Sequence, residues 1–147
     1  MQMSEPTASP ASWNDQVIEQ FKAGEQRIAG MFDRSALLLL HTKGAKTGQQ
    51  RTSPVAYFTS DDQIVIVASA AGRDQHPAWY FNLVANPVVT IERWKDDAIE
   101  SITAKAVSVE GPERDRIWSE ITSVAPGFAD YQTKTSRLIP VITLQSL

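Results

Sequence analysis

The sequence LLLLHTKGAKTGQQRTSPVAYF, residues 37–58, contains the pattern that decides the fold. An apolar run over residues 36–42 ends at Gly44, and an extended pattern resumes over residues 51–59 after a polar turn that Gly48 closes. Two extended runs joined by a short turn with glycines are typical of a β-hairpin. We therefore predict two neighbouring antiparallel strands at this point.

The rest of the chain extends this hairpin into a larger sheet. The expected order is a helix at 13–31, strands at 36–42, 51–59 and 63–69, a helix at 77–85, strands at 88–93 and 98–109, a helix from 111 and a strand at 138–144. Incomplete alternation over 98–109 predicts a bulge near Ser101. Because regular βαβ alternation is missing, we expect a mostly antiparallel barrel with helices packed outside it.

Composition limits the class of protein. The 147 residues suit one domain, expected over residues 13–147 after a polar, mobile tail at 1–12. The chain has no cysteine, which excludes disulfides and thiolate metal sites. A net charge of −3 argues against general nucleic-acid binding. No apolar run is long enough to span a membrane, and loose membrane contact by the first helix stays open. We expect a cytoplasmic protein, which the absence of cysteine suits.

The predicted hairpin tip concentrates positive charge in an acidic protein. Lys43, Lys46 and Arg51 lie within nine residues of one another, together with two glycines. Such a turn can offer backbone N–H groups and cations to a phosphate or carboxylate. The same residues also suit a solvated hairpin tip, so this motif alone leaves both interpretations open.

Two later segments could line a ligand site. The small residues at 68–72 would let a flat ligand approach the backbone, and three aromatic residues at 79–81 follow His76 at the start of a helix. Each segment alone also fits an ordinary loop or a core-facing helix. Tyr131 could donate a hydrogen bond to a substrate oxygen, or could be a half-buried packing residue.

Several common chemistries have no support. His41 and His76 are the only histidines, and neither has neighbours at metal-ligand spacing, so no metal site is expected. The chain has neither the G-x-S-x-G pattern of hydrolases nor the G-x-G-x-x-G pattern of dinucleotide-binding folds.

From residue 37 to residue 144 the sequence resembles the deazaflavin-dependent nitroreductase family. The blocks that carry the resemblance are the hairpin at 37–58, VIVASAAG at 65–72, HPAWYFNLVANPVVTI at 76–91 and PGFADYQTKTSRLIPVITL at 126–144. The resemblance implies an FMN-binding-like split β-barrel, in the α+β but mainly β class, with about six strands and flanking helices. It also implies an enzyme that moves a hydride from reduced coenzyme F420 to a small electron-poor acceptor, namely a quinone, an activated enone or lactone, or a nitro compound.

The resemblance also assigns roles to residues. Tyr131 and Ser69 are the candidate catalytic residues, with Tyr131 at the substrate side of the cofactor ring. Lys46, Thr47, Gly48 and Arg51 of the hairpin would hold the cofactor's phosphate and acidic tail. The full set of expected cofactor-binding residues is Lys46, Thr47, Gly48, Gln49, Gln50, Arg51, Pro54, Val55, Ala68, Ser69, Ala70, Ala71, Gly72, Ala78, Trp79, Tyr80, Asn82 and Tyr131.

Two departures from the family pattern stand out. Ala70 occupies a position where relatives often have lysine, which leaves one cation fewer for the cofactor tail. Phe128 and Lys134 stand near Tyr131 where the nitroimidazole-reducing members carry tyrosines, and this difference argues against nitro-drug reduction. The alternatives are an FMN-dependent reductase on the same barrel and a non-catalytic carrier of the cofactor or another anionic ligand. A homodimer is compatible with either alternative.

Overall fold

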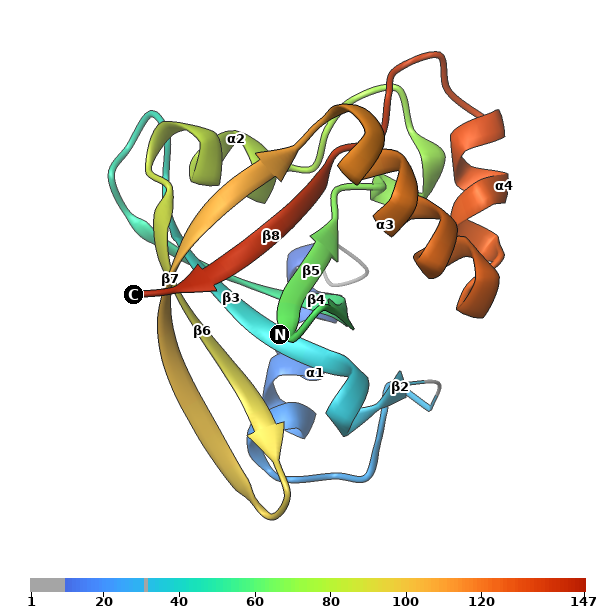
Figure 1. Cartoon of the computed structure of the whole chain (residues 1–147). Coiled ribbons are helices and arrows are strands. Elements are labelled where there is room, and N and C mark those ends of the chain that lie inside the picture. Colours follow the sequence, from blue (N-terminus) through green and yellow to red (C-terminus); the bar gives the residue numbers. More distant parts are fainter. Residues whose placement is uncertain (1–9, 31) are drawn as a thin grey trace.

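Six strands form a closed antiparallel barrel in the order β3-β4-β5-β8-β7-β6. The computed structural model describes residues 10–30 and 32–147. The barrel strands are β3 (Leu37–Lys43), β4 (Gln50–Ser60), β5 (Gln63–Val67), β6 (Val88–Lys95), β7 (Ala98–Val109) and β8 (Val141–Ser146). The last strand of the chain, β8, lies between β5 and β7 and completes the barrel (Figure 1). The predicted antiparallel barrel is thereby confirmed.

Helices surround this barrel. They are α1 (Pro10–Lys22), α2 (Ala78–Ala85), α3 (Gly111–Val124) and α4 (Gly127–Thr133), with the short turns η1 (Arg34–Ala36) and η2 (Ala70–Gly72) and the two-residue strands β1 (Arg27–Ile28) and β2 (Phe32–Asp33). Figure 1 shows α3 and α4 on one side of the barrel and α1 near the β6–β7 turn. None of the helices in the described ranges is long and apolar enough to cross a membrane.

The leucine run at the start of β3 is buried on both faces of the sheet. Leu38 and Leu40 point into the barrel, where they join its central apolar cluster. Leu37 and Leu39 belong instead to a second cluster with Val17 and other residues beneath α1. A strand covered on both faces favours a continuous apolar run over strict alternation.

A third apolar cluster packs α3 against the outside of the barrel. Val65 of β5 and Val141 of β8 contact Ile117 and Ile121 of α3, and all four side chains are buried. Phe128 and Tyr131 of α4 pack against the same cluster. These contacts fix α4 beside β5, next to the loop that leaves this strand.

Two local predictions were wrong. The first helix ends at Lys22 instead of Met31, because Gly24 adopts a left-handed conformation with φ of +78°. The pairing of β6 with β7 is continuous through Ser101, so no bulge interrupts it. Alternation fails there because Ile99 packs on the outer face, in the cluster beneath α1. The predicted tail at 1–12 lies mostly outside the described residues, and α1 begins at Pro10.

The C-terminal segment also differs from its prediction. Ala125 and Pro126 separate the short helix α4 from α3, and the sequence pattern gave no sign of a separate helix there. The last strand begins at Val141 instead of Leu138, since Pro140 has no N–H to donate to a sheet.

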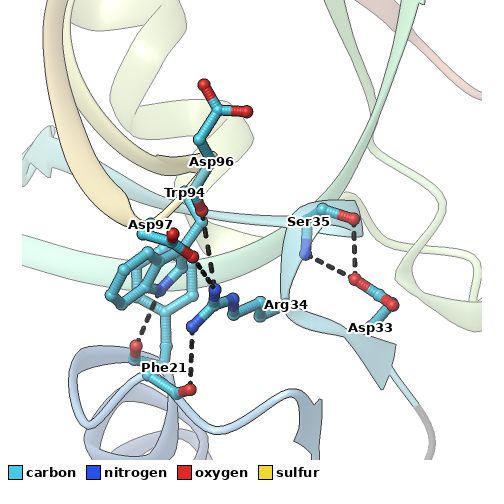
Figure 2. Close-up of polar contacts among 8 residues, drawn as sticks. Phe21, Asp33, Arg34, Ser35, Trp94, Asp96 and Asp97 are labelled. Atoms are coloured by element: carbon cyan, nitrogen blue, oxygen red, sulfur yellow. Dashed lines mark hydrogen bonds and ion pairs between the residues drawn. The ribbon is translucent and has the colours of Figure 1, made fainter.

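A cluster around Arg34 ties α1 to the β6–β7 turn (Figure 2). The Arg34 guanidinium lies 4.3 Å from the centre of the Trp94 ring and donates a hydrogen bond of 2.9 Å to the Gly24 carbonyl. The Trp94 indole N–H donates to the Phe21 carbonyl at 2.8 Å. These contacts hold the C-terminal end of α1, so they also fix the direction in which the helix runs over the barrel.

We expect Arg34→Met to lower the free energy of unfolding by about 1–3 kcal/mol, because it removes a charged hydrogen bond and a cation–π contact. Arg116→Met is the matched control, since Arg116 forms only exposed ion pairs with Asp61 and Glu120. Its expected cost is below about 1 kcal/mol. Urea unfolding of both variants measures the difference, and equal losses would show that the Arg34 cluster does not anchor α1.

Candidate functional site

The tip between β3 and β4 is a tight turn held by its own backbone. The Gly44 N–H donates to the Gln49 carbonyl at 2.7 Å, and the Gly48 N–H donates to the Gly44 carbonyl at 2.9 Å. A Cβ atom on Gly44 would lie only 2.6 Å from the Thr47 hydroxyl oxygen. Gly48 has a φ of +71°. Both positions therefore favour glycine.

Helix α2 supports this tip. The Asn82 side chain accepts a hydrogen bond of 3.0 Å from the Ala45 N–H and donates one of 3.2 Å to the Thr42 hydroxyl. Asn86 donates to the Lys43 carbonyl at 3.4 Å. Asn82, predicted to bind the cofactor, thus also holds the hairpin against the helix.

A large cavity, here called the hairpin cavity, lies between the tip and α2 and has a volume of about 980 Å³. It is lined by Asn14, Gly44, Ala45, Lys46, Thr47, Arg51, Thr52, Ser53, Ala78, Trp79, Phe81, Asn82, Val84 and Ala85. Lys46 and Arg51 are both exposed. Among the residues that the structure describes, neither forms an ion pair with a carboxylate. Their charge is therefore available to an anion.

A second cavity of about 560 Å³, here called the loop cavity, lies beside η2. It shares Asn14, Ser53, Ala78 and Trp79 with the hairpin cavity. Its other lining residues are Trp13, Phe32, Pro54, Val55, Ala56, Val67, Ser69, Ala70, Ala71, Arg73, Pro77 and Phe128. Because they share a wall, the two cavities form one groove with a cationic end and a largely apolar end.

The groove brings together most of the residues predicted to bind the cofactor. The residues that line it are Lys46, Thr47, Arg51, Pro54, Val55, Ser69, Ala70, Ala71, Ala78, Trp79 and Asn82. Gln49 lies at the hairpin tip without lining either cavity, and Ala68 and Gly72 are buried. Tyr80 lines a separate small cavity against α3.

Gly48 and Gln50 lie on the other side of the hairpin. They border a third cavity of about 570 Å³ that also contains His41 and Glu92. His41 Nε2 is 2.7 Å from a Glu92 carboxylate oxygen, and His41 Nδ1 is 2.9 Å from the Thr52 hydroxyl. The hairpin therefore presents different residues to two separate cavities.

The loop after β5 has an unusual backbone. Ala70, Ala71 and Gly72 all adopt positive φ angles, of 48°, 55° and 82°. A positive φ costs an alanine about 1–2 kcal/mol, so surrounding contacts must hold this conformation. Gly72 also approaches α4 closely, because a Cβ atom there would lie 2.8 Å from the Tyr131 carbonyl oxygen.

Tyr131 lies behind the groove instead of on its wall. Its half-buried ring packs edge-on against Phe128 with centroids 5.7 Å apart, and the Lys134 ammonium is 5.7 Å from the ring centre. Phe128, one turn earlier on α4, lines the loop cavity. The catalytic role of Tyr131 stays a prediction.

Arg137 holds the loop from behind. Its guanidinium donates to the carbonyls of Arg73 at 2.8 Å, Ser69 at 2.7 Å and Ala68 at 3.1 Å. It also lies 3.0 Å from His76 Nδ1. Partial burial lowers the pKa of His76 below its usual range, and the positive charge of Arg137 lowers it further. His76 is thus kept neutral and can accept the hydrogen bond.

Sequence reasoning did not assign four residues that the structure places at or beside the groove. Trp13 and Asn14 of α1 line it, although the helical pattern indicated only a core-facing stripe. Arg73 also lines it, and Arg137 supports its loop. Arg73 and Arg137 lie far apart in the sequence, so no local spacing pattern could have revealed that they meet at the loop.

The closed barrel defines a split-barrel protein, and the groove on its surface is its candidate ligand site. The sequence profile of the F420H2-dependent quinone reductases matches residues 13–146. The chain belongs to this F420H2-dependent quinone reductase family.

A curated relative and a solved structure carry a matching description, and a second solved structure is similar in sequence and fold. An F420H2-dependent quinone reductase of Mycobacterium tuberculosis (strain H37Rv) is 43% identical over 108 residues, which cover 73% of this chain and 71% of the relative. A solved F420H2-dependent reductase is 37% identical, with a TM-score of 0.64 over 75% of this chain and 94% of its own. A structure described as a domain-swapped dimer is 35% identical, with a TM-score of 0.67 over 93% of this chain and 100% of its own.

The lowered pKa of His76 predicts a pH dependence of stability. A histidine that is kept neutral in the fold stabilises it above the ordinary pKa of about 6.5, and this contribution is lost as the pH falls through the folded-state pKa. Arg137, Tyr80 and Phe81 face the ring, and Asp74 lies near the Arg137 charge. His76→Asn keeps an acceptor at a position equivalent to Nδ1 without titrating.

We therefore expect acidification from about pH 7.5 to about pH 5.5, a span that crosses the histidine pKa, to destabilise the wild type more than His76→Asn. Urea unfolding at both pH values measures the two losses. Equal losses would show that His76 is not kept neutral by the fold.

Proposed function

We propose that this protein transfers a hydride from reduced coenzyme F420 to a quinone-like acceptor, and that the groove holds the cofactor. The observation that carries the proposal is the combination of family membership with a groove that has two unpaired cations at one end. The same groove has apolar side chains and exposed loop backbone at its other end. An elongated cofactor with an acidic tail and a flat ring matches both ends.

The cationic end fits the acidic tail. Lys46 and Arg51 face the hairpin cavity without carboxylate partners in the described part of the chain. In a chain with a net charge of −3, these two cations form a local positive site. We assign them to the phosphate and acidic tail, where a charged donor binds more strongly than a neutral one.

The loop cavity suits the ring. Pro54, Val55 and Trp79 give it apolar surface, and Ala70 and Ala71 have side chains small enough to expose the backbone. When bound, the reduced cofactor supplies the hydride. The chain's own contribution is to orient the reactants and to exclude water from between them.

Two residues are proposed to act on the acceptor. Tyr131 would donate a hydrogen bond to an acceptor oxygen as negative charge develops on it. Ser69 lines the loop cavity and its hydroxyl makes no capping bond to η2, so it is free to contact a reactant. Phe128 connects the loop cavity with Tyr131, because it lines the cavity and packs against the Tyr131 ring.

The remaining organisation belongs to the same proposal. Residues 13–147 would form one cofactor-binding domain, located in the cytoplasm with loose contact to a membrane. A similar solved structure is described as a domain-swapped dimer. We propose that this chain also forms a homodimer.

Lys46→Ala and Arg51→Ala should each weaken F420 binding by about ten-fold or more, because a charge-assisted contact contributes about 1.5–3 kcal/mol. Lys43→Ala is the matched control. Lys43 belongs to the same hairpin but borders the cavity on its other side, so its removal should leave the Kd nearly unchanged. Fluorescence titration of F420 measures all three.

Equal weakening by all three substitutions would indicate general electrostatic attraction without a specific site. The same titration with FMN tests the main alternative cofactor. Tight FMN binding together with no F420 binding would replace the proposal with an FMN-dependent reductase.

Tyr131→Phe keeps the ring and removes only the hydroxyl. If this hydroxyl acts on the acceptor, turnover should fall by ~10² while the KM changes little. Tyr57→Phe is the control, since Tyr57 packs on the barrel away from the groove. Steady-state kinetics with a quinone and saturating reduced F420 measures both. A turnover number within about two-fold of wild type would make Tyr131 a packing residue.

A further inference from the structure

Arg137 contacts two walls of the groove without lining either cavity. Through the Ser69 and Arg73 carbonyls it holds the loop, and through His76 it reaches the segment that leads into α2. Pro77, Ala78 and Trp79 directly follow His76 and line the loop cavity. A single planar guanidinium thus joins the loop wall to the helix wall.

We propose that Arg137 is a positioning residue that sets the separation of these two walls for the cofactor ring. The inference rests on the proposed function, because it assigns the loop cavity to the ring. Arg137 does not line the loop cavity, so it would act on the ring only through the loop backbone that it binds.

The conformation of the loop explains why such a residue is needed. Ala70 and Ala71 have positive φ angles, which alanine adopts only at an energetic cost. The carbonyls on both sides of this strained pair, those of Ser69 and Arg73, both accept hydrogen bonds from Arg137. With both ends bound to one rigid group, the strained turn cannot relax by extending.

Arg137 is itself held from α4. Gln132 donates to the Arg137 carbonyl at 2.7 Å and accepts from the Ile139 N–H at 3.0 Å. The Arg137 N–H donates to the Thr135 hydroxyl at 3.3 Å. The guanidinium is therefore carried on a fixed backbone, and α4 and the loop are coupled through it.

Arg114 of α3 provides a matched comparison, because it binds the same segment just before β8. It is buried, donates to the Ile139 carbonyl at 2.7 Å and lies 4.7 Å from the centre of the Trp118 ring. Both arginines therefore stabilise the chain just before β8, but only Arg137 contacts the loop. A purely structural role predicts the same effects for both, whereas a positioning role predicts a difference confined to the loop and the cofactor.

The experiment compares Arg137→Met, Arg137→Lys and Arg114→Met with the wild type. Hydrogen exchange without cofactor follows the amides of residues 69–76, and fluorescence titration gives the F420 Kd. Arg137→Met should speed exchange in this segment and weaken F420 binding, each by about ten-fold or more, since several hydrogen bonds to a charged donor are lost. Arg114→Met should lower the Tm while leaving loop exchange and the Kd unchanged.

Arg137→Lys separates charge from geometry. A lysine keeps the positive charge but cannot present a fork of donors to three carbonyls and an imidazole. We expect it to bind F420 nearly as weakly as Arg137→Met, and full recovery by lysine would overturn the positioning role. Unchanged F420 binding in Arg137→Met would also overturn it. A wild type that binds no F420 refutes the proposed function instead, while the exchange measurement still tests whether Arg137 orders the loop.

Discussion

The pairing of β8 with both β5 and β7 is the interaction on which the rest of the structure depends. Ile66 lies opposite Ile142, and Ala106 lies opposite Leu144, so this strand completes the wall around the central apolar cluster. The residues just before β8 hold the η2 loop, and the outer faces of β5 and β8 support α3 and α4. The same C-terminal segment therefore closes the barrel and shapes the groove.

The groove separates two kinds of recognition along its length. Its cationic end depends on exposed side chains of the hairpin tip, which can change without disturbing the core. Its other end depends on the shape of the backbone. That shape is set by the strained residues Ala70 and Ala71 and by hydrogen bonds from the Arg137 guanidinium, which is distant in the sequence. In the proposed function, charge at one end would attract the anionic tail from a distance, and shape at the other would select the flat ring at contact range.

Local sequence patterns were sufficient where neighbours along the chain determine structure. The hairpin around Gly44 and Gly48 and the cations beside it could be predicted because apolar runs and glycines mark them directly. The end of α1 could not, since Gly24 stops a helix whose apolar periodicity continues beyond it. Arg137 and Asn14 escaped detection for another reason. Their roles arise from contacts with residues distant in the sequence, and no spacing rule encodes such contacts.

The position of β8 has a consequence for synthesis of the protein. During translation this strand emerges after the other barrel strands, so until then β5 and β7 each lack one of their two hydrogen-bonded neighbours. Unpaired strand edges with apolar faces readily join edges of other chains. The nascent chain is therefore most exposed to association with other chains before β8 enters the gap between β5 and β7.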